Sequence, residues 1–144
     1  MVTVADVARL LGGKAGIGRT VHTFADFGSA IAAGFPSAAL QHVLSSSEVT
    51  ATEISDWLRI PVRTLMRLKE RERLPADESD KLYRFVYIVA VAQKALGNRD
   101  RGTSGLRREN GALGGAIPVR LISTEPGFRA VEQVLGRIDY GAVS

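Results

Sequence analysis

Apolar residues recur at helical spacing along most of the chain. Between residues 75 and 96 they are separated by three or four positions, among them Leu82, Val89, Ala92 and Leu96. This period is typical of an amphipathic helix. The same spacing predicts further helices over residues 2–11, 24–33, 36–44, 50–58, 61–70, 119–123 and 128–135. No segment shows a convincing strand pattern, so the sequence predicts an all-α fold.

Three segments interrupt this pattern. Two of these segments, residues 12–20 (GGKAGIGRT) and residues 99–116, are rich in glycine. We therefore expect the first to be a flexible connection and the second to be a weakly ordered, basic segment. Residues 136–144 predict a tail after the last helix. These breaks divide the chain into an N-terminal helix and linker (1–20), a central helical domain (21–98) and a C-terminal domain (99–144).

Residues 50–71 (TATEISDWLRIPVRTLMRLKER) carry the strongest local signal. Thr50 and Glu53 have the spacing of a capping box, which begins a helix. A short turn follows, and Pro61 suits the first turn of a second helix because proline lacks an N–H there. Two short helices joined in this way predict a helix-turn-helix, with Trp57 in its core. The alternative is a helical hairpin that contacts only its neighbours.

In a DNA-binding helix-turn-helix, the second helix enters the major groove. Helical spacing directs Leu65 and Leu68 to the core. The outward positions predict a DNA-binding set of Arg63, Thr64, Arg67 and Lys69, beside Val62. Arginine can pair with guanine, and Arg or Lys can neutralise phosphates. Thr64 either contacts a phosphate or stays within the fold.

The charge distribution supports this prediction. The net charge is +4, but residues 59–108 hold 13 basic and 6 acidic residues, whereas the remainder of the chain is acidic. A basic segment of this size indicates a surface for a polyanion. A well-solvated surface is the alternative.

The composition excludes several kinds of chemistry. There is no cysteine and there are only two histidines, His22 and His42, so we expect no metal site and no cofactor. Residues 13–20 have the spacing of a phosphate-binding loop, but a predicted helix precedes them where such a loop needs a strand. The sequence shows no set of residues with the spacing of a catalytic site, so we expect that the chain is not an enzyme. The longest apolar run has 8 residues against about 20 for a membrane span, and no signal peptide is recognisable, which predicts a cytoplasmic protein.

Several short motifs, taken together, resemble the Xre/MbcA/ParS antitoxins of RES–Xre toxin–antitoxin pairs. Residues 60–67 (IPVRTLMR) and 74–82 (LPADESDKL) resemble the family's recognition helix and the start of its long helix. Residues 113–118 (LGGAIP), 121–127 (LISTEPG) and 131–141 (VEQVLGRIDYG) resemble its C-terminal motifs. The likeness extends over about residues 28–144.

One stretch departs from the family pattern. Where the family has a helix with a K-A-x-x-W-L segment, this chain has residues 101–106 (RGTSGL). Gly102 and Gly105 replace Ala and Trp, and each glycine costs about 1 kcal/mol of helix propensity. We therefore expect this helix to be poorly formed.

The resemblance implies an Xre-like helix-turn-helix domain, followed by a small helical toxin-binding domain. It implies a homodimer that binds operator DNA and represses its own operon. It also implies that the C-terminal region blocks the active site of an NAD-degrading RES-domain toxin, with Arg137, Ile138, Tyr140 and Gly141 as the candidate toxin-binding residues. Alternatively, Ile138 and Tyr140 only dock the tail on its own domain, or the chain is a stand-alone transcriptional regulator.

Overall fold

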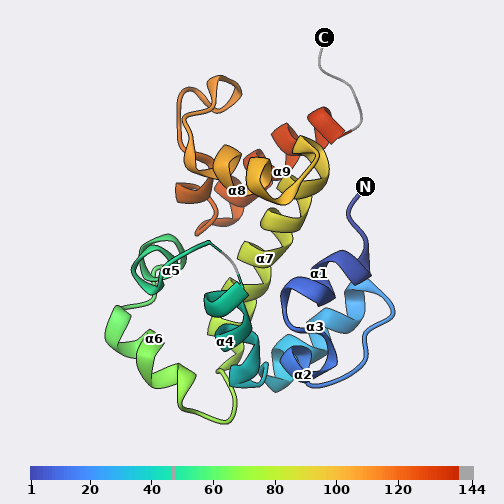
Figure 1. The fold of residues 1–144 in the computed structure, drawn as a ribbon, viewed down its shortest axis with the longest axis vertical. Coiled ribbons are helices and arrows are strands. Elements are labelled where there is room, and N and C mark those ends of the chain that lie inside the picture. The colour runs from blue at the N-terminus through green and yellow to red at the C-terminus, as the bar shows by residue number, and fades with distance from the viewer. Residues whose placement is uncertain (47, 140–144) are drawn as a thin grey trace. The chain divides into compact units, whose positions relative to one another are not determined.

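The computed structural model describes residues 1–46 and 48–139, which form helices joined by turns (Figure 1). No strand occurs within these residues, only two isolated β-bridges, so the all-α prediction is confirmed. Contacts divide the chain into an N-terminal unit of residues 3–86 and a C-terminal unit of residues 1, 2 and those from 87 onward. The N-terminal unit contains α1 (Val4–Leu10), α2 (Gly13–Ile17), α3 (Phe24–Ala33), α4 (Ser37–Ser46), α5 (Ala51–Leu58), α6 (Val62–Lys69) and the first half of α7 (Ala76–Leu96). The C-terminal unit contains the rest of α7, α8 (Arg99–Arg107), the 3₁₀-helices η1 (Gly111–Leu113) and η2 (Pro118–Arg120), and α9 (Glu125–Asp139).

Three helices of the N-terminal unit begin with a capping box. In each, a threonine hydroxyl accepts a hydrogen bond from the backbone N–H of the residue three positions later, and the carboxylate of that residue accepts one from the backbone N–H of the threonine. The pairs are Thr3 with Asp6 in α1, Thr23 with Asp26 in α3, and Thr50 with Glu53 in α5. At α5 the two hydrogen bonds measure 3.1 Å and 3.0 Å, which confirms the prediction there. Each box satisfies backbone donors that the first helical turn leaves unpaired.

The core of the N-terminal unit combines aliphatic side chains with a few aromatic rings. Phe27 is 1% exposed and its ring centroid lies 5.1 Å from that of Tyr83. Trp57 is buried, with its ring centroid 6.0 Å from that of Phe85. The prediction that Trp57 is a core residue is therefore confirmed.

The turn between α6 and α7 is hydrogen-bonded to the turn between α3 and α4. The N–H of Leu74 donates to the carbonyl of Phe35 (2.8 Å), and the N–H of Phe35 donates to the hydroxyl of Ser79 (2.9 Å). Arg73 Nη1 donates to the carbonyl of Gly34 (2.9 Å). Ser79 is fully buried, so its bond satisfies an N–H that water cannot reach. These bonds fix the C-terminal end of the helix-turn-helix segment.

The prediction of a flexible connection over residues 12–20 is wrong, because α2 occupies Gly13–Ile17 and packs against α4. A Cβ on Gly16 would lie 1.6 Å from the carbonyl oxygen of Leu11 and 3.4 Å from the Cα of Ala39. Gly12 adopts a positive φ of 93°, which side chains disfavour. These glycines therefore permit a close approach of backbones, and they are not a sign of mobility.

The prediction for residues 99–116 is also wrong, because α8 and η1 form there and the helix expected to be weak is present. A Cβ on Gly102 would lie 2.8 Å from both Cα and N of Gln93, and one on Gly105 would lie 2.5 Å from Cδ1 of Leu96. Glycine at both positions lets α8 pack closely against α7, which offsets its low helix propensity.

The last helix is longer than the predicted 128–135. It begins at Glu125, where the N–H of Phe128 donates to the carbonyl of Thr124 (2.9 Å), and it continues to Asp139. Residues 136–139 are therefore helical where a tail was predicted. The reason is that the apolar stripe of α9 extends at helical spacing from Val131 through Leu135 to Ile138.

Candidate functional site

A tight turn of residues 59–61 separates α5 from α6. Arg59 ends α5 in the left-handed conformation (φ 57°, ψ 48°), which is uncommon for a residue with a side chain. The hydroxyl of Ser55 donates to the carbonyl of Ile60 (2.6 Å), and the N–H of Ile60 donates to the carbonyl of Ser55 (3.1 Å). Pro61 then precedes the first helical turn of α6. Two eight-residue helices joined in this way have the geometry of a helix-turn-helix.

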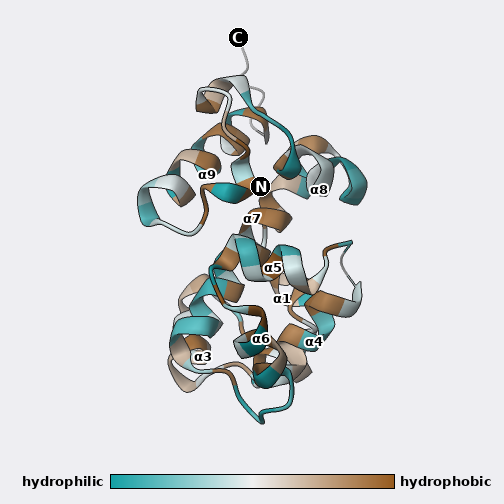
Figure 2. Ribbon diagram, turned by 90° about the vertical axis from the view of Figure 1, so that its left-hand side faces the viewer, coloured by the Kyte–Doolittle hydropathy of each residue, from teal (hydrophilic) through white to brown (hydrophobic). Residues whose placement is uncertain are grey.

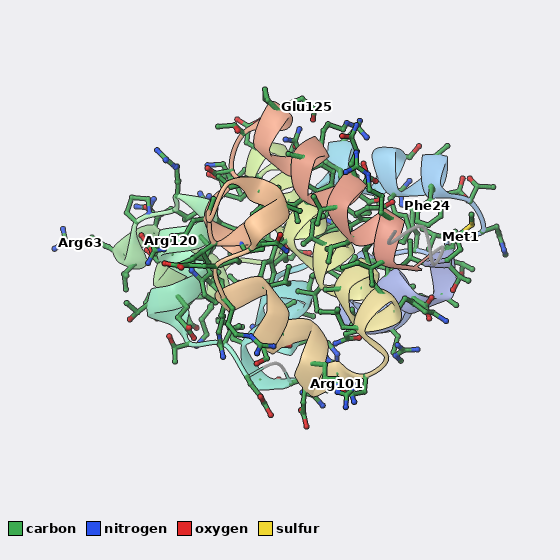
Figure 3. The ribbon with its side chains drawn as sticks, turned by 90° about the horizontal axis from the view of Figure 1, so that it is seen from above. Met1, Phe24, Arg63, Arg101, Arg120 and Glu125 are labelled. Atoms are coloured by element: carbon green, nitrogen blue, oxygen red, sulfur yellow. The ribbon has the colours of Figure 1, made fainter. Side chains whose placement is uncertain are left out.

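Helix α6 presents a buried face and an exposed face. Leu65 and Leu68 are 1% and 2% exposed, as predicted, and the mixture of apolar and polar residues along α6 can be followed in Figure 2. Arg63 points away from the ribbon in Figure 3. Together with Arg67 it is exposed. Because α6 packs against the core through Leu65 and Leu68, Arg63 and Arg67 on its other side remain accessible to solvent.

The structure separates the four predicted DNA-binding residues into two pairs. Arg63 and Arg67 lie one turn apart on the exposed face, and within the described residues neither guanidinium group has an ion pair or hydrogen bond. Thr64 and Lys69 are half-buried. The carbonyl of Lys69 accepts from Nε2 of Gln41 in α4 (2.9 Å), so this end of α6 is tied to the unit.

Sequence reasoning missed Met66 on the same face. Met66 is 37% exposed and Val62 is 44% exposed, although both are apolar. The spacing could have predicted this exposure. Val62 and Met66 are four residues apart and share one face of the helix, which differs from the face of Leu65 and Leu68.

In the C-terminal unit, α9 carries the candidate toxin-binding residues that the structure describes. Its apolar stripe is buried in its own unit: Phe128, Val131, Val134 and Leu135 are all at most 9% exposed. Arg137 is exposed, whereas Ile138 is half-buried at the end of the stripe. Tyr140 and Gly141 lie outside the described residues. Arg137 and Ile138 therefore lie in different environments.

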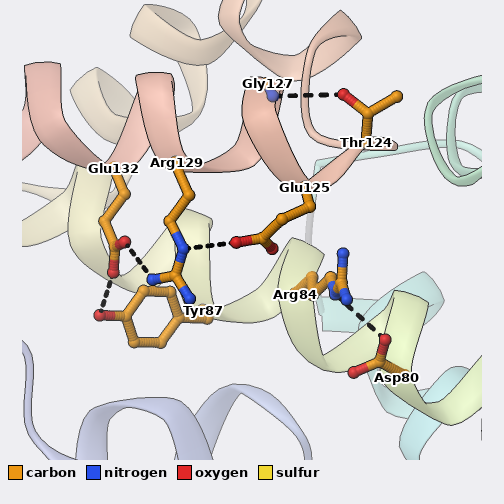
Figure 4. Close-up of polar contacts among 8 residues, drawn as sticks. All are labelled: Asp80, Arg84, Tyr87, Thr124, Glu125, Gly127, Arg129 and Glu132. Atoms are coloured by element: carbon orange, nitrogen blue, oxygen red, sulfur yellow. Dashed lines mark hydrogen bonds and ion pairs between the residues drawn. The ribbon is translucent and has the colours of Figure 1, made fainter.

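Helix α9 also holds a polar cluster that sequence reasoning missed (Figure 4). Arg129 donates to Glu125 through Nε (2.7 Å) and to Glu132 through Nη1 (3.0 Å). These hydrogen bonds, first that to Glu125 and then that to Glu132, raise the pKa of Arg129. The hydroxyl of Tyr87 in α7 donates to the other oxygen of Glu132 (2.8 Å). The cluster therefore connects α9 to the second half of α7 within the C-terminal unit.

The described residues contain no group of three or more His, Asp or Glu side chains placed to hold a metal ion. In the same residues, no helix combines the length and the apolar character that crossing a membrane would require.

Comparison with known families assigns both units. Residues 26–87 match the antitoxin Xre-like helix-turn-helix domain, and residues 92–141 match the antitoxin Xre/MbcA/ParS C-terminal toxin-binding domain. The chain belongs to the Xre/MbcA/ParS antitoxin family. The first match includes α5 and α6, and the second includes α8 and α9. Residues 1–25, which contain α1 and α2, lie outside both matched ranges.

Two curated relatives of this family are similar to the chain. An antitoxin Xre of Pseudomonas putida is 34% identical over 83 residues, which is 57% of this chain and 52% of the relative. An antitoxin Xre of Photorhabdus laumondii subsp. laumondii is 32% identical over 79 residues, which is 54% of this chain and 53% of the relative. The matches therefore span about half the length of these relatives.

Proposed function

We propose that the chain is an antitoxin with two separate binding surfaces. Its C-terminal unit neutralises a cognate NAD-degrading RES-domain toxin by blocking the toxin's active site. Its N-terminal unit binds operator DNA as a homodimer and represses the chain's own operon. Two features of one chain carry the proposal: a helix-turn-helix in which Arg63 and Arg67 have no partner among the described residues, and a second unit that matches a toxin-binding family model.

The exposed face of α6 supports the DNA-binding part. Arg63 and Arg67 have no partner among the described residues, so pairing with guanine or phosphate breaks no existing ion pair. Two arginines at this spacing can contact neighbouring positions in the major groove. Thr64 and Lys69 then act at the edge of this surface, against the phosphates, because both are half-buried.

The toxin-binding part requires shape and charge, but no chemistry from this chain. A toxin that degrades NAD⁺ must hold a dinucleotide whose nicotinamide ring is positively charged, and the exposed guanidinium of Arg137 can occupy the position of that charge. Ile138, Tyr140 and Gly141 follow directly and are proposed to fill the toxin's cleft. Aromatic and Arg side chains are frequent anchors at protein interfaces. The proposed role is therefore that of an inhibitor, and not of an enzyme.

Co-expression tests the toxin-binding part. The RES-domain protein proposed as the cognate toxin is expressed with the full chain, with Arg137→Glu, or with a chain lacking residues 140–144, and growth and NAD⁺ are measured. Both altered chains should lose protection. The matched control is Gln133→Glu, which introduces a glutamate one turn earlier on the exposed side of α9. Protection that persists in both altered chains would refute the proposed mechanism.

A second candidate function is a stand-alone transcriptional regulator. It is favoured by the position of Ile138, which continues the buried stripe of α9 and is half-buried in its own unit. In that case the chain binds its operator but gives no protection against the toxin. The same co-expression experiment therefore separates the two functions.

A further inference from the structure

Large apolar side chains that are exposed are rare in the described part of the chain, and two of them share one face of α6. The four such residues are Met1, Phe24, Val62 and Met66. A single exposed apolar residue needs no explanation. Val62 and Met66, however, lie one helical turn apart, so their side chains form a continuous apolar row.

This apolar row runs beside a basic row. Arg63 and Arg67 are each one position further along α6 than Val62 and Met66, so the two rows are adjacent on the exposed face. Val62 is also the first residue of α6. In a helix-turn-helix, the N-terminal residues of the second helix reach the base edges. Val62 and Arg63 therefore occupy the positions closest to the base edges, and Met66 and Arg67 follow one turn later on the same face.

The chemistry of the major groove matches two such rows. Guanine presents two acceptors that suit an arginine, and thymine is distinguished from cytosine by its C5-methyl group, which makes apolar contacts. We propose that Val62 and Met66 determine sequence specificity by packing against the C5-methyl groups of thymines that adjoin the guanines paired with Arg63 and Arg67. This inference rests on the proposed operator binding and names the residues that select thymine.

A protein partner fits the face less well than DNA. The apolar row is only two side chains long, and a protein covering it would also remove from water the guanidinium groups of Arg63 and Arg67, which have no partner among the described residues. Burying a charge without a partner is unfavourable. In the groove, guanine acceptors and phosphates supply that partner while the methyl groups cover the apolar row.

The experiment begins with the full chain selecting its site from a random pool of DNA duplexes. Each thymine of the selected site is then replaced by deoxyuridine, which removes the methyl group and keeps the base-pairing edge. Affinity is measured for the native chain, for Val62→Ala and for Met66→Ala. Phe24→Ala is the matched control, because it truncates another exposed apolar side chain of the same unit. Thermal unfolding of each variant confirms that it is folded.

The native chain should lose about four-fold in affinity at one or two deoxyuridine positions, the value expected for one methyl group. At those positions, Val62→Ala or Met66→Ala should remove most of the effect, whereas Phe24→Ala should leave it unchanged. A site that is selected but insensitive to deoxyuridine, or a methyl effect that persists in both α6 variants, overturns the inference and leaves operator binding intact. So does a loss of toxin binding in these variants at unchanged DNA affinity, which would assign the row to a protein interface. If no site is selected, the proposed operator binding itself fails and the inference fails with it.

Discussion

Helices α6 and α9 are both amphipathic, but their exposed faces differ. In α6, Arg63 and Arg67 are unpaired among the described residues, and Val62 and Met66 remain exposed. In α9, the large apolar stripe is buried, and Arg129 is held by Glu125 and Glu132.

The difference indicates where each unit needs a partner. Among the described residues, no partner satisfies the guanidinium groups on the outer face of α6, and its apolar area stays exposed. We therefore propose this face as the binding surface of the N-terminal unit. The middle of α9 is satisfied within its own unit. We therefore propose that the C-terminal unit binds its partner through the end of α9, where Arg137 is exposed, and through the residues that follow.

The largest expected effect concerns the two faces of α6. Leu65→Ala removes a side chain that is 1% exposed and should lower the free energy of unfolding by about 2–5 kcal/mol. Met66→Ala, its neighbour on the exposed face, should change that free energy by at most about 0.5 kcal/mol. Denaturant unfolding of both variants provides the measurement. Similar losses for the two would show that α6 has no free face.

A second effect separates α6 from α9 in DNA binding. Arg63→Ala should weaken binding to the selected site by about 1–3 kcal/mol and flatten its salt dependence, because a base or phosphate contact is lost. Arg137→Ala, which changes another exposed arginine in the other unit, should leave both quantities unchanged. Titrations at several salt concentrations measure both. An equal loss for Arg137→Ala would mean that the two surfaces are not separate.

A third effect compares two glycines of the C-terminal unit. Gly102→Ala places a Cβ 2.8 Å from backbone atoms of Gln93 and should destabilise by about 1–3 kcal/mol through overpacking, despite the gain in helix propensity. Gly136→Ala in α9 meets open space and should stabilise by about 0.5–1 kcal/mol. Thermal unfolding should therefore shift in opposite directions. Stabilisation by both changes would show that α8 does not pack closely against α7.

The smallest effect concerns acid stability. Backbone N–H groups of His22 and Thr23 hydrogen-bond the Asp26 carboxylate and lower its pKa. Asp26 therefore contributes stability above its unfolded pKa of about 3.9, and this contribution is lost as the pH falls through the lower folded value. Below about pH 4, Asp26→Asn should lose stability less steeply than the native chain. Parallel stability curves for the two would contradict the assigned role.

The sequence predicted the helices best where periodicity determines them. The period of apolar residues predicted α7 to its last residue, and Leu65 and Leu68 correctly fixed the buried side of α6. The predictions for the glycine-rich segments were wrong because the sequence does not show which residues pack against a glycine. Gly16 lies near Ala39, and Gly102 lies near Gln93, and only these tertiary contacts explain why glycine forms a helix there.

The candidate sites divide in a similar way. The exposure of Arg63 and Arg67 followed from their offset from two leucines. Met66 was missed because an apolar residue is ordinarily assigned to a core. The spacing of Glu125, Arg129 and Glu132 is a local signal that could have revealed their cluster, whereas the contact of Tyr87 with Glu132 joins residues 45 positions apart and has no local signature.

The central claim is that operator binding and toxin neutralisation use separate surfaces of one chain. The most direct test expresses the Arg63→Ala/Arg67→Ala chain from an inducible promoter, together with its proposed RES-domain toxin, and measures cellular NAD⁺. We expect full protection of NAD⁺ by a chain that no longer binds the selected DNA site. Loss of protection in this variant, at normal abundance and stability, would contradict the account.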